Sequence, residues 1–551
     1  MEPMKILTAK EMQACDRLTT ERYGVSSVDL MRAASRALAA FARERFPRAR
    51  RATVLAGCGN NGGDGMMAAR LLSQAGLEVT TLLFGSRDAL TGDALIAWNE
   101  LTSPPAGLVH VVESAEQLAT LDSVLETDLI LDALLGTGFK PPLRGLAAEA
   151  LRWFLAHPKA EKTPVLAVDL PSGWPADSTA LLAPYPCFPA DAVLTFTAPK
   201  PAHVFGALTR RWDQPVCVAP IGSPDEAIQT TSALHWAGSA HALVEPLRPV
   251  AANKGNFGHV LIVGGSVGKS GAPSMASMAA LRAGAGLVTA AVPAPILNMV
   301  AAIAPELMTY PLVATANGQI APENLAPKAL ETLLRGITVL ALGPGLGQSP
   351  EAVKFVTGLL SATHIPAVLD ADALNILAAK PVLLAKLAKT RPLILTPHPG
   401  EMSRLAGIPT AEIQADRLGT ARSFAQRLGV TLVLKGARTL VAHPDGQVGV
   451  NTSGNPAQAK GGSGDTLTGI VTALVAQYPD QLAQAVEAAV YLHGLAADFA
   501  LRRQDQHTLL ATDSLASLSR AFRFRPQGPG AYLWIGGLPV THRPFPREAA
   551  E

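Results

Sequence analysis

The sequence predicts an α/β protein with two domains, each built on a mainly parallel sheet. At 551 residues the chain is too long for one ordinary domain. Short runs that are apolar throughout, as in parallel strands buried on both faces, alternate with Ala- and Leu-rich helical stretches. This alternation stops near residues 220–250 and then restarts. The restart indicates a second sheet rather than an extension of the first.

In the first half, apolar runs that end in turns are expected to be buried strands. These runs are residues 52–57, 128–133, 165–170 and 192–197. A helix is expected from Asp64 to Gln74, directly after the first glycine-rich loop. Strand, glycine turn and helix in repetition predict a doubly wound parallel sheet.

The second half repeats the pattern and adds a hairpin. Strand-like runs ending in turns cover residues 258–265, 339–345, 367–372, 393–398 and 431–436. Helices are expected at 272–283, 411–428 and 465–477. The Asp445-Gly446 pair lies between two apolar runs and predicts antiparallel strands at one edge of the sheet.

The weak segment near residues 220–250 has neither a strand run nor a clear helical period. It is expected to separate domains at 1–225 and 235–525, and residues 526–551 are expected to form a loose tail because they are polar and rich in proline.

Composition excludes several classes of partner. Lys and Arg number 46 against 44 Asp and Glu, and aromatic residues are 5%, so no nucleic acid or membrane partner is expected. The most apolar region, 272–304, contains Arg282 and several prolines and glycines, which argues against a bilayer span. The 4 cysteines show neither metal spacing nor a disulfide framework, and the charged start lacks a signal-peptide pattern. We expect a reduced cytoplasmic protein that forms a homo-oligomer.

Three glycine-rich turns in the first half carry polar side chains. They are GCGNNGGDG at 57–65, DALLGTGFKPPLRG at 132–145 and VDLPSGWPAD at 168–177. Parallel strands bring their carboxyl ends to one crevice, where such sheets bind ligands. A purely structural tight turn is the alternative for the first loop, but such a turn would not need Asn60, Asn61 and Asp64.

These motifs resemble the YjeF N-terminal domain, the NAD(P)HX epimerase, over residues 1–220. The resemblance implies a Rossmann-like sheet and an isomerase of hydrated NADH and NADPH. It implies dinucleotide contacts from Asn60, Asn61, Gly62, Gly63, Asp64, Gly136, Thr137, Gly138, Phe139, Lys140, Pro141, Pro142 and Asp169. It further implies a potassium ion held by Asn61, Asp132 and Ser172, whose oxygens suit a hard cation.

Epimerisation needs one positioned acid or base. The ring nitrogen of the substrate can expel hydroxide from the neighbouring carbon once the hydroxyl is protonated, and water can return to either face. Asp169 is the candidate for this proton transfer. Lys200 resembles a recurring lysine of the family and could assist, or it could be a solvated surface lysine.

The most informative stretch of the second half is GNPAQAKGGSGDTLTGI at 454–470. Its glycines lead into an apolar helix, whose first N–H groups can stabilise negative charge on a transferred phosphoryl group. Asp465 stands at the same point and can take a proton from an attacking hydroxyl. The motif resembles the anion hole and base of the ribokinase-like superfamily, which implies an α/β sandwich. A plain glycine-capped helix is the alternative.

With GPGLG at 343–347, LDADALN at 369–375, TPHPGEMSRL at 396–405 and KGART at 435–439, the second half resembles the ADP/ATP-dependent NAD(P)HX dehydratase, a lyase. The likeness covers residues 235–515, and the whole chain resembles the fused bacterial repair family. It implies contacts to the hydrated cofactor from Ala272, Gly347, His398, Pro399, Gly400, Glu401, Met402, Ser403, Arg404 and Asp465. It implies contacts to the nucleotide from Lys435, Gly436, Ala437, Arg438, Thr439 and Gly464.

The implied reaction converts a poor leaving group into a good one. Asp465 would activate the C6 hydroxyl toward the terminal phosphate of ADP with Mg²⁺ present, and loss of phosphate would give NADH or NADPH and AMP. The S form is the expected substrate of this step, and ADP is expected because the fused arrangement looks bacterial.

Some residues depart from the family pattern. Ser270 stands where an aromatic residue is usual, and Ala457, Gln458 and Lys460 replace three residues of the usual loop. A ribokinase-like kinase of a vitamin or sugar alcohol, fused to a nucleotide-binding domain, is the alternative enzyme. A catalytically silent nucleotide-binding or partner-binding protein is a third reading.

Overall fold

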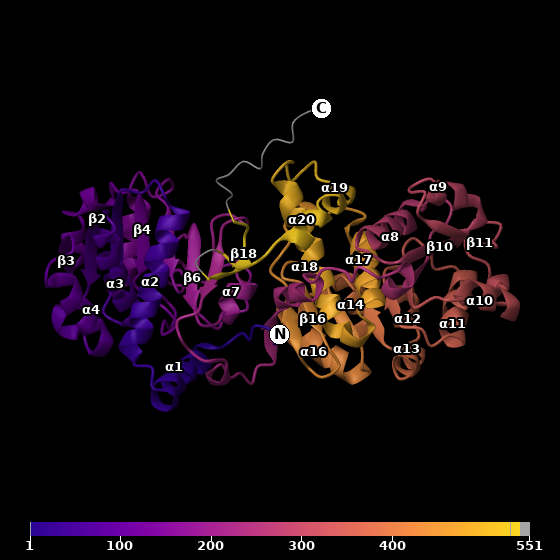
Figure 1. Ribbon diagram of the computed structural model, residues 1–551, viewed down its shortest axis with the longest axis horizontal. Coiled ribbons are helices and arrows are strands. Elements are labelled where there is room, and N and C mark those ends of the chain that lie inside the picture. The colour runs from indigo at the N-terminus through magenta and orange to yellow at the C-terminus, as the bar shows by residue number, and fades with distance from the viewer. Residues whose placement is uncertain (1, 529–530, 540–551) are drawn as a thin grey trace. The chain divides into compact units, whose positions relative to one another are not determined.

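The computed structural model describes residues 2–528 and 531–539 and divides into two compact units (Figure 1). The N-terminal unit comprises Met4–Ser232 and the segment that starts at Arg525. The C-terminal unit comprises Ala233–Phe524 and the first residues of the chain. Both are parallel-dominated α/β units, as the sequence predicts.

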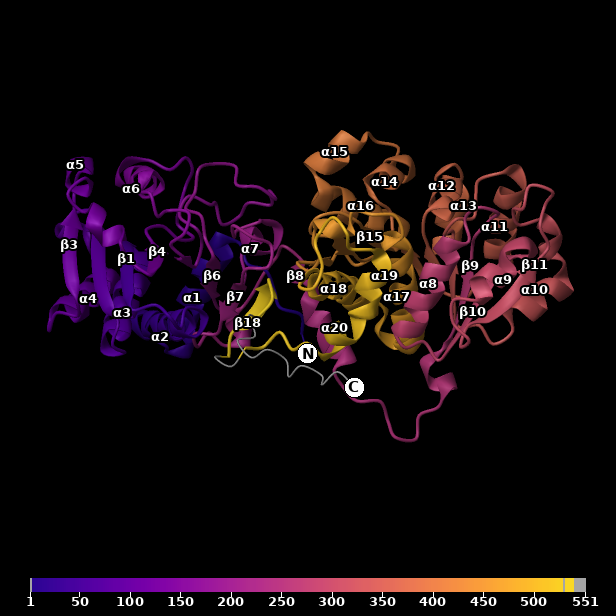
Figure 2. The same cartoon turned by 90° about the horizontal axis from the view of Figure 1, so that it is seen from above.

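The N-terminal unit contains an 8-stranded sheet in the order β18-β7-β6-β5-β4-β1-β2-β3 (Figure 2). Its strands are β1 (Arg51–Gly57), β2 (Glu78–Phe84), β3 (Leu108–Val112), β4 (Leu129–Ala133), β5 (Val165–Val168), β6 (Ala192–Phe196), β7 (Val216–Ala219) and β18 (Leu533–Gly536). Its helices are α1 (Ala9–Tyr23), α2 (Ser27–Arg45), α3 (Asn60–Gln74), α4 (Gly92–Thr102), α5 (Ala115–Leu118), α6 (Gly145–Ala156) and α7 (Pro201–Phe205).

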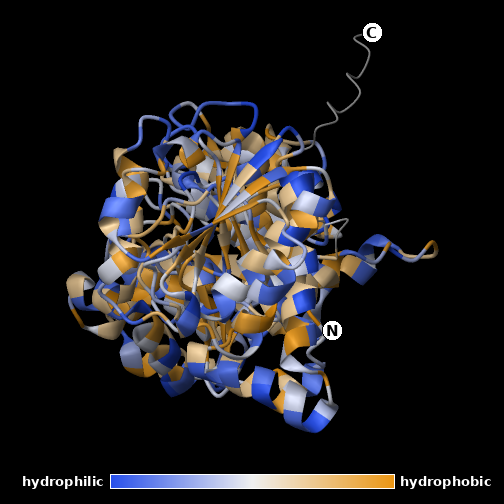
Figure 3. Ribbon diagram, turned by 90° about the vertical axis from the view of Figure 1, so that its left-hand side faces the viewer, coloured by the Kyte–Doolittle hydropathy of each residue, from blue (hydrophilic) through white to orange (hydrophobic). Residues whose placement is uncertain are grey.

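Helices cover both faces of this sheet, and its central strands are therefore mostly apolar, with Thr53 and Asp132 as buried polar exceptions. Met31 of α2, Met66 of α3 and Trp98 of α4 pack with strand residues on one face. Phe154 of α6 packs with Ile130 on the other face. Figure 3 shows the central strands mostly in the hydrophobic colour, with hydrophilic bands on the surrounding helices.

The end of the chain differs from the sequence expectation of a loose tail. Residues 533–536 form β18, which pairs antiparallel with β7 at the edge of the N-terminal sheet. Tyr532 is 1% exposed and stacks edge-on against Phe41 of α2, with ring centroids 5.2 Å apart. Polar composition hid this strand, because only Tyr532, Trp534, Ile535 and Leu538 are buried among the described residues of the expected tail. Residues 540–551 of the expected tail lie outside the described residues.

The C-terminal unit contains a 10-stranded sheet in the order β11-β10-β9-β12-β13-β14-β15-β16-β17-β8. Its strands are β8 (Leu234–Trp236), β9 (His259–Val263), β10 (Leu287–Pro293), β11 (Met308–Leu312), β12 (Val339–Leu342), β13 (Ala367–Leu369), β14 (Leu393–Leu395), β15 (Thr431–Leu434), β16 (Leu440–Ala442) and β17 (Val448–Val450). Its helices are α8 (Gly271–Arg282), α9 (Leu297–Ala301), α10 (Pro327–Leu334), α11 (Pro350–Ala362), α12 (Asp372–Ala378), α13 (Pro381–Ala388), α14 (Pro399–Ala406), α15 (Thr410–Ala415), α16 (Arg417–Leu428), α17 (Ser463–Gln477), α18 (Leu482–Leu501), α19 (Ala511–Ala516) and α20 (Leu518–Arg523).

Helix α17 is the central helix of this unit. It packs over β9, β12 and β13 with α8 and α18 beside it, which explains why residues 466–476 are all buried. A helix that is apolar all round is one that is enclosed by other elements. The glycine loop therefore starts a helix that is held firmly against the sheet.

Two further expectations are corrected and one is confirmed. The segment near 220–250 does contain a strand, β8, which pairs parallel with β17 and forms the sheet edge. The helix expected at 411–428 is two helices, because Asp416 breaks the first and its side chain accepts a hydrogen bond from Gly419 N at the start of the second. The hairpin around Asp445-Gly446 is present as antiparallel β16 and β17.

No helix within residues 2–528 and 531–539 has the length and hydropathy that a bilayer span requires.

Candidate functional site

A cavity of about 760 Å³ opens at the carboxyl ends of the N-terminal strands. Its walls include residues 57–61 and Asp64 after β1, residues 134–139 after β4, and Asp169 and Lys200. The convergence of the three glycine-rich turns, predicted from the sequence, is therefore observed. Helices α1 and α2 supply much of the remaining wall, which no motif had indicated.

Not every residue of the predicted set lines this cavity. Gly62 lies beneath it, and a Cβ there would come within 1.8 Å of the Gly57 carbonyl oxygen, so this glycine permits close packing. Gly63 is likewise buried against Met31. Lys140, Pro141 and Pro142 are exposed and do not belong to the wall.

Lys200 is buried, with a side-chain exposure of 2%, so the reading as a solvated surface lysine is wrong. Its Nζ donates to Asp169 Oδ1 at 2.9 Å and to Thr195 Oγ1 at 2.7 Å. Thr195 in turn donates to the same Asp169 oxygen at 2.7 Å. Asp169 has φ 64, a left-handed conformation that turns the chain sharply after β5, and its carbonyl is bonded to His203 Nε2 at 2.7 Å.

This network sets the charge of Asp169. Burial alone would raise its pKa, but the Lys200 ammonium group and the hydrogen bonds from Lys200 and Thr195 outweigh burial and hold the pKa of Asp169 below its ordinary value. Burial lowers the pKa of His203 to about 4, so that ring is neutral. Asp169 is therefore an anion whose Oδ1 already accepts two hydrogen bonds.

Asp132 and Ser172, two of the three residues predicted to hold potassium, are in contact. Ser172 donates to Asp132 through its Oγ at 2.5 Å and through its backbone N at 2.7 Å. Asp132 is 0% exposed, and burial raises its pKa to about 6 despite these bonds. Asn61 packs against Gly136, which lies in the turn that follows Asp132. The Nδ2 atom of Asn61 is buried without a hydrogen-bond partner. Carboxylate, hydroxyl and amide groups gathered in this way fit a hard cation.

Four more carboxyl groups line the cavity, those of Asp16, Glu21, Asp64 and Asp93, and burial shifts the pKa of two of them. Burial raises the pKa of Asp64 well above its ordinary value, and Asp169 and Asp16 add to this effect. Burial likewise raises the pKa of Asp16 of α1 to about 6. Sequence reasoning identified Asp64 from its loop but missed Asp16, because Asp16 stands in an ordinary charged helix with no local signal.

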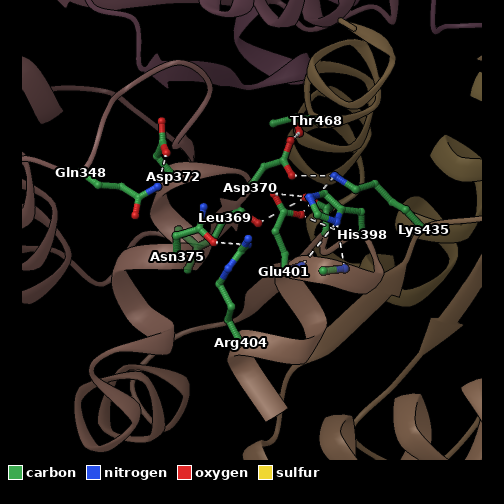
Figure 4. A network of polar contacts seen from close by, with 12 residues as sticks. Gln348, Leu369, Asp370, Asp372, Asn375, His398, Glu401, Arg404, Lys435 and Thr468 are labelled. Atoms are coloured by element: carbon green, nitrogen blue, oxygen red, sulfur yellow. Dashed lines mark hydrogen bonds and ion pairs between the residues drawn. The ribbon is translucent and has the colours of Figure 1, made fainter. Parts of the chain in front are cut away.

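In the C-terminal unit, polar side chains gather where β13, β14 and β15 end beside the start of α17 (Figure 4). Asp370 follows β13 and is 2% exposed. Lys435 follows β15 and donates from Nζ to Asp370 Oδ1 at 2.9 Å. Thr468 of α17 donates to the other Asp370 oxygen at 2.8 Å. Asp370 belongs to the LDADALN motif, but the sequence alone did not assign it a role.

Asp465 lies in the first turn of α17, close to this pair. Gly464 beside it is so near that an added Cβ would stand 3.4 Å from Lys435 Nζ and 3.8 Å from Asp370 Oδ2. Burial, followed by repulsion from Asp370, raises the pKa of Asp465 to about 6, while Lys435 acts against the rise. Asp370 and Glu401 outweigh burial at Lys435 and hold its pKa above the ordinary value. The result is a base poised near neutral pH beside a permanent ammonium group.

The predicted segment from His398 to Arg404 forms the start of α14. His398 Nδ1 accepts from Gly400 N at 3.0 Å and from Glu401 N at 3.3 Å, so this histidine caps the helix. Its ring remains half exposed, at 52%. Glu401 is buried, accepts from His398 N at 2.9 Å, and lies 3.8 Å from Lys435 Nζ. Arg404 donates to Asn375 Oδ1 at 2.8 Å.

Other predicted residues surround this centre. Gly347 N donates to Asp372 Oδ2 at 2.8 Å, and Gly345 of the same turn faces Ala272 at the start of α8. Arg438 has φ 55, donates to Thr452 O at 2.8 Å, and burial lowers its pKa to about 10. The Lys435–Thr439 turn is therefore supported from beneath by the chain leading to the glycine loop.

The unusual loop residues have structural roles. Ala457 is buried, and Gln458 contacts both Asn455 N, at 3.3 Å, and His493. Lys460 donates to the His507 carbonyl rather than extending freely. Asp498 of α18 holds the start of the loop through Gly454 N and Asn455 Nδ2, each at 2.9 Å. Sequence reasoning did not identify Asp498.

Among the described residues, no three His, Cys, Asp or Glu side chains are arranged to hold a metal ion by themselves.

Comparisons with known proteins cover both units. A family profile described as NAD(P)H-hydrate dehydratase matches residues 260–520, and one described as YjeF-related protein N-terminus matches residues 27–202. The chain is 40% identical over 532 residues to the bifunctional NAD(P)H-hydrate repair enzyme Nnr of Moorella thermoacetica, covering 94% of this chain and 97% of that one. It is 36% identical to the protein of the same name from Escherichia coli, covering 94% of each.

Several solved structures are also similar to the C-terminal half, and one of them serves as an example. The ADP/ATP-dependent NAD(P)H-hydrate dehydratase of Bacillus subtilis, co-crystallised with ATP and Mg²⁺, is 32% identical and covers 52% of this chain and 96% of its own, with a TM-score of 0.45.

Proposed function

The chain belongs to the family of bifunctional NAD(P)H-hydrate repair enzymes, and from this premise we propose how its residues perform the two reactions. The N-terminal unit is the epimerase and the C-terminal unit is the dehydratase. The substrates are NADHX and NADPHX, in which C6 of the nicotinamide ring carries a hydroxyl group beside N1. The observation that carries the dehydratase assignment is Asp465 at the start of α17, next to the Asp370–Lys435 ion pair.

In the N-terminal unit, the cavity binds the dinucleotide across the carboxyl ends of the strands. The loop from Asn60 to Asp64 and the turn from Gly136 to Phe139 hold its polar parts. When the N1 electron pair expels the hydroxyl from C6, positive charge develops on the ring. The Asp169 carboxylate, held by Lys200 and Thr195, stabilises this charge at no reorganisation cost.

Potassium is the cation we propose for Asn61, Asp132 and Ser172. When bound there it would supply positive charge that offsets the buried Asp132 carboxylate. The support is the fully buried Asp132 carboxylate in contact with Ser172, and the Asn61 side chain that packs against Gly136 in the turn after Asp132.

In the C-terminal unit, Asp465 takes the proton of the C6 hydroxyl as its oxygen attacks the terminal phosphorus of ADP. The bond from that phosphorus to the oxygen of AMP breaks. The first N–H groups of α17 donate hydrogen bonds to the equatorial oxygens of the transferred phosphoryl group. The C6–O bond of the phosphate ester then breaks with the push of N1. Loss of a proton from C5 completes the double bond, giving NADH or NADPH, AMP and phosphate.

The nucleotide is proposed to bind over the Lys435–Thr439 turn. A Mg²⁺ ion would be held mainly by the nucleotide's own phosphates, with Asp370 or Glu401 as the protein carboxylate, because the described residues form no three-ligand site. The ion supplies charge neutralisation for the transferring phosphoryl group. ADP is proposed as the donor.

A direct test mixes purified protein with NADHX and follows absorbance at 340 nm, with ADP and with ATP in separate reactions. Recovery of NADH that needs a nucleotide and releases AMP from ADP supports the proposal. A phosphorylated product that accumulates without recovery of absorbance would contradict the elimination step.

A further inference from the structure

Helix α1 forms one wall of the N-terminal cavity and is firmly anchored there. Its N-terminus is closed by a capping box between Thr8 and Glu11, and the second oxygen of Glu11 accepts from Thr231 N at 2.8 Å. The preceding Leu7 N donates to Pro199 O at 2.9 Å, next to Lys200. Met12 and Cys15 pack with Leu7 and Ala198. These contacts fix the position of Asp16, the residue that follows Cys15 in α1, close to Lys200.

Asp16 presents an unusual carboxyl group to the cavity. Its Oδ1 is shielded from solvent and has no hydrogen-bond partner. A buried polar atom without a partner requires an explanation, since native proteins pair almost all such atoms. An unpaired oxygen in the wall of a substrate cavity is explained if the substrate itself supplies the partner.

The charges around Asp16 make it a proton carrier near neutral pH. Burial raises its pKa to about 6, Lys200 acts against this rise, and Asp169 adds to it. Cys15 lies beside it on α1, and Arg17 and Glu21 of the same helix also reach the cavity wall. From the other elements, Asp64 of α3 and Asp93 of α4 face the same space.

The neighbouring carboxyl groups are less suited to this task. Asp169 is held as an anion by Lys200 and Thr195 and has no proton to donate. Asp64 has a pKa raised well above the ordinary value and keeps its proton more tightly. A proton carrier works best when its pKa lies near the working pH, which is the case for Asp16.

We propose that Asp16 is the catalytic acid and base of the epimerase site, donating a proton to the departing C6 hydroxyl and recovering one from the returning water. The inference rests on the epimerase activity proposed above and names the group that performs its proton transfer. The Asp16 O–H proton moves to the hydroxyl oxygen, the C6–O bond breaks, and the N1 electron pair forms the C6–N1 double bond. The planar ring then turns over in the cavity, so that water adds to the other face of C6 from the side of Asp16 and returns one proton to the Asp16 carboxylate. No atom or electron is gained or lost overall.

The test uses the full chain without ADP, so that the dehydratase reaction does not run. Exchange between the R and S epimers of NADHX is followed by NMR, and the rate without protein is subtracted. Asp16→Asn is compared with Asp88→Asn, the same change at an exposed aspartate outside the cavity wall. The affinity for NADHX is measured separately by calorimetry.

We expect Asp16→Asn to slow exchange by roughly 10²–10⁴-fold with affinity changed only a few-fold, and Asp88→Asn to match wild type. In wild type, kcat/KM should fall as pH rises through about 6, because Asp16 must carry its proton to act first. This fall should be absent in Asp16→Asn, and Asp16→Glu should restore part of the rate. A calorimetric unfolding transition of the N-terminal unit that matches wild type would show that the Asp16→Asn variant is folded.

Wild-type exchange in Asp16→Asn, or a pH profile that this change leaves intact, would overturn the assignment. If wild type itself fails to exchange the epimers, the proposed epimerase function falls, and the assignment of Asp16 falls with it.

Discussion

Replacing Asp465 with Asn separates catalysis from stability in the C-terminal unit. The substitution removes the base but keeps the size of the side chain and the glycine cradle around it. General bases contribute about 10²–10⁴-fold, so ADP-dependent NADH recovery should fall by that factor with nucleotide affinity nearly unchanged. In wild type the rate should rise with pH up to about 6 and then level off, because Asp465 acts only when it is ionised.

The same substitution should stabilise the fold. The folded pKa of Asp465 is about 6 against 3.8 as the ordinary value, a rise of about two pH units that corresponds to about 3 kcal/mol as an upper bound. Because the folded pKa is the higher one, folding disfavours the charged form. This cost is fully present above pH of about 6, falls to about half near pH 5, and vanishes below the unfolded pKa. Asp465→Asn should therefore increase the free energy of unfolding most at pH 8.

Urea unfolding at pH 8 and pH 5 measures this gain, and absorbance at 340 nm measures the rate. Asp480→Asn is the matched control, because this aspartate is exposed and stands outside the site. A variant of Asp465 that keeps the wild-type rate would place the base elsewhere. A variant that is less stable than wild type at pH 8 would refute the burial argument.

Three further changes test other parts of the structure. Tyr532→Ala should lower the free energy of unfolding of the N-terminal unit by about 3 kcal/mol, because it removes a buried ring that packs on Phe41 and anchors β18; calorimetry that detects no shift would contradict this. Asp132→Ala should weaken NADHX binding and abolish any acceleration of epimerisation by potassium, tested against a bulky organic cation; an unchanged potassium response would exclude this residue as a ligand. A protein of residues 233–524 should recover NADH rapidly from the S epimer only. The R epimer should be consumed only when the full chain is present. Equal rates on both epimers, after spontaneous exchange is subtracted, would contradict this division of the two reactions between the units.

The sequence predicted those features that depend on local chemistry. Gly57 and Gly462 mark turns that lead into helices, because a Cβ at Gly57 would meet the Leu134 carbonyl oxygen and Gly462 has a positive φ. The polar residues beside these turns, such as Asn61 and Asp465, were found for the same reason. Uniformly apolar runs predicted both parallel sheets, and a single Asp-Gly pair predicted the β16–β17 hairpin.

Features with no local signal were missed. Strand β8 has three residues and β18 has four, too few to show a period, and each is stabilised only by a neighbouring strand distant in sequence. The local sequence around Asp16 is typical of a surface helix, and the local sequence around Asp498 is typical of the end of a helix, so neither residue has a distinguishing pattern. Their roles follow from α1 lying on the cavity and from α18 lying beneath the glycine loop.

By itself, the sequence determined the fold class and the positions of the candidate turns, and its resemblance to a known family indicated the two reactions. Backbone geometry and side-chain chemistry at a turn depend on consecutive residues. Only the tertiary structure decided which charges meet. Burial beside Lys200 makes Asp169 an anion, whereas burial without a bonded cation leaves Asp16 and Asp465 able to exchange protons near pH 6. The protonation state of a carboxyl group depends on solvent exclusion and on the charges within a few ångströms, and these come from segments far apart along the chain.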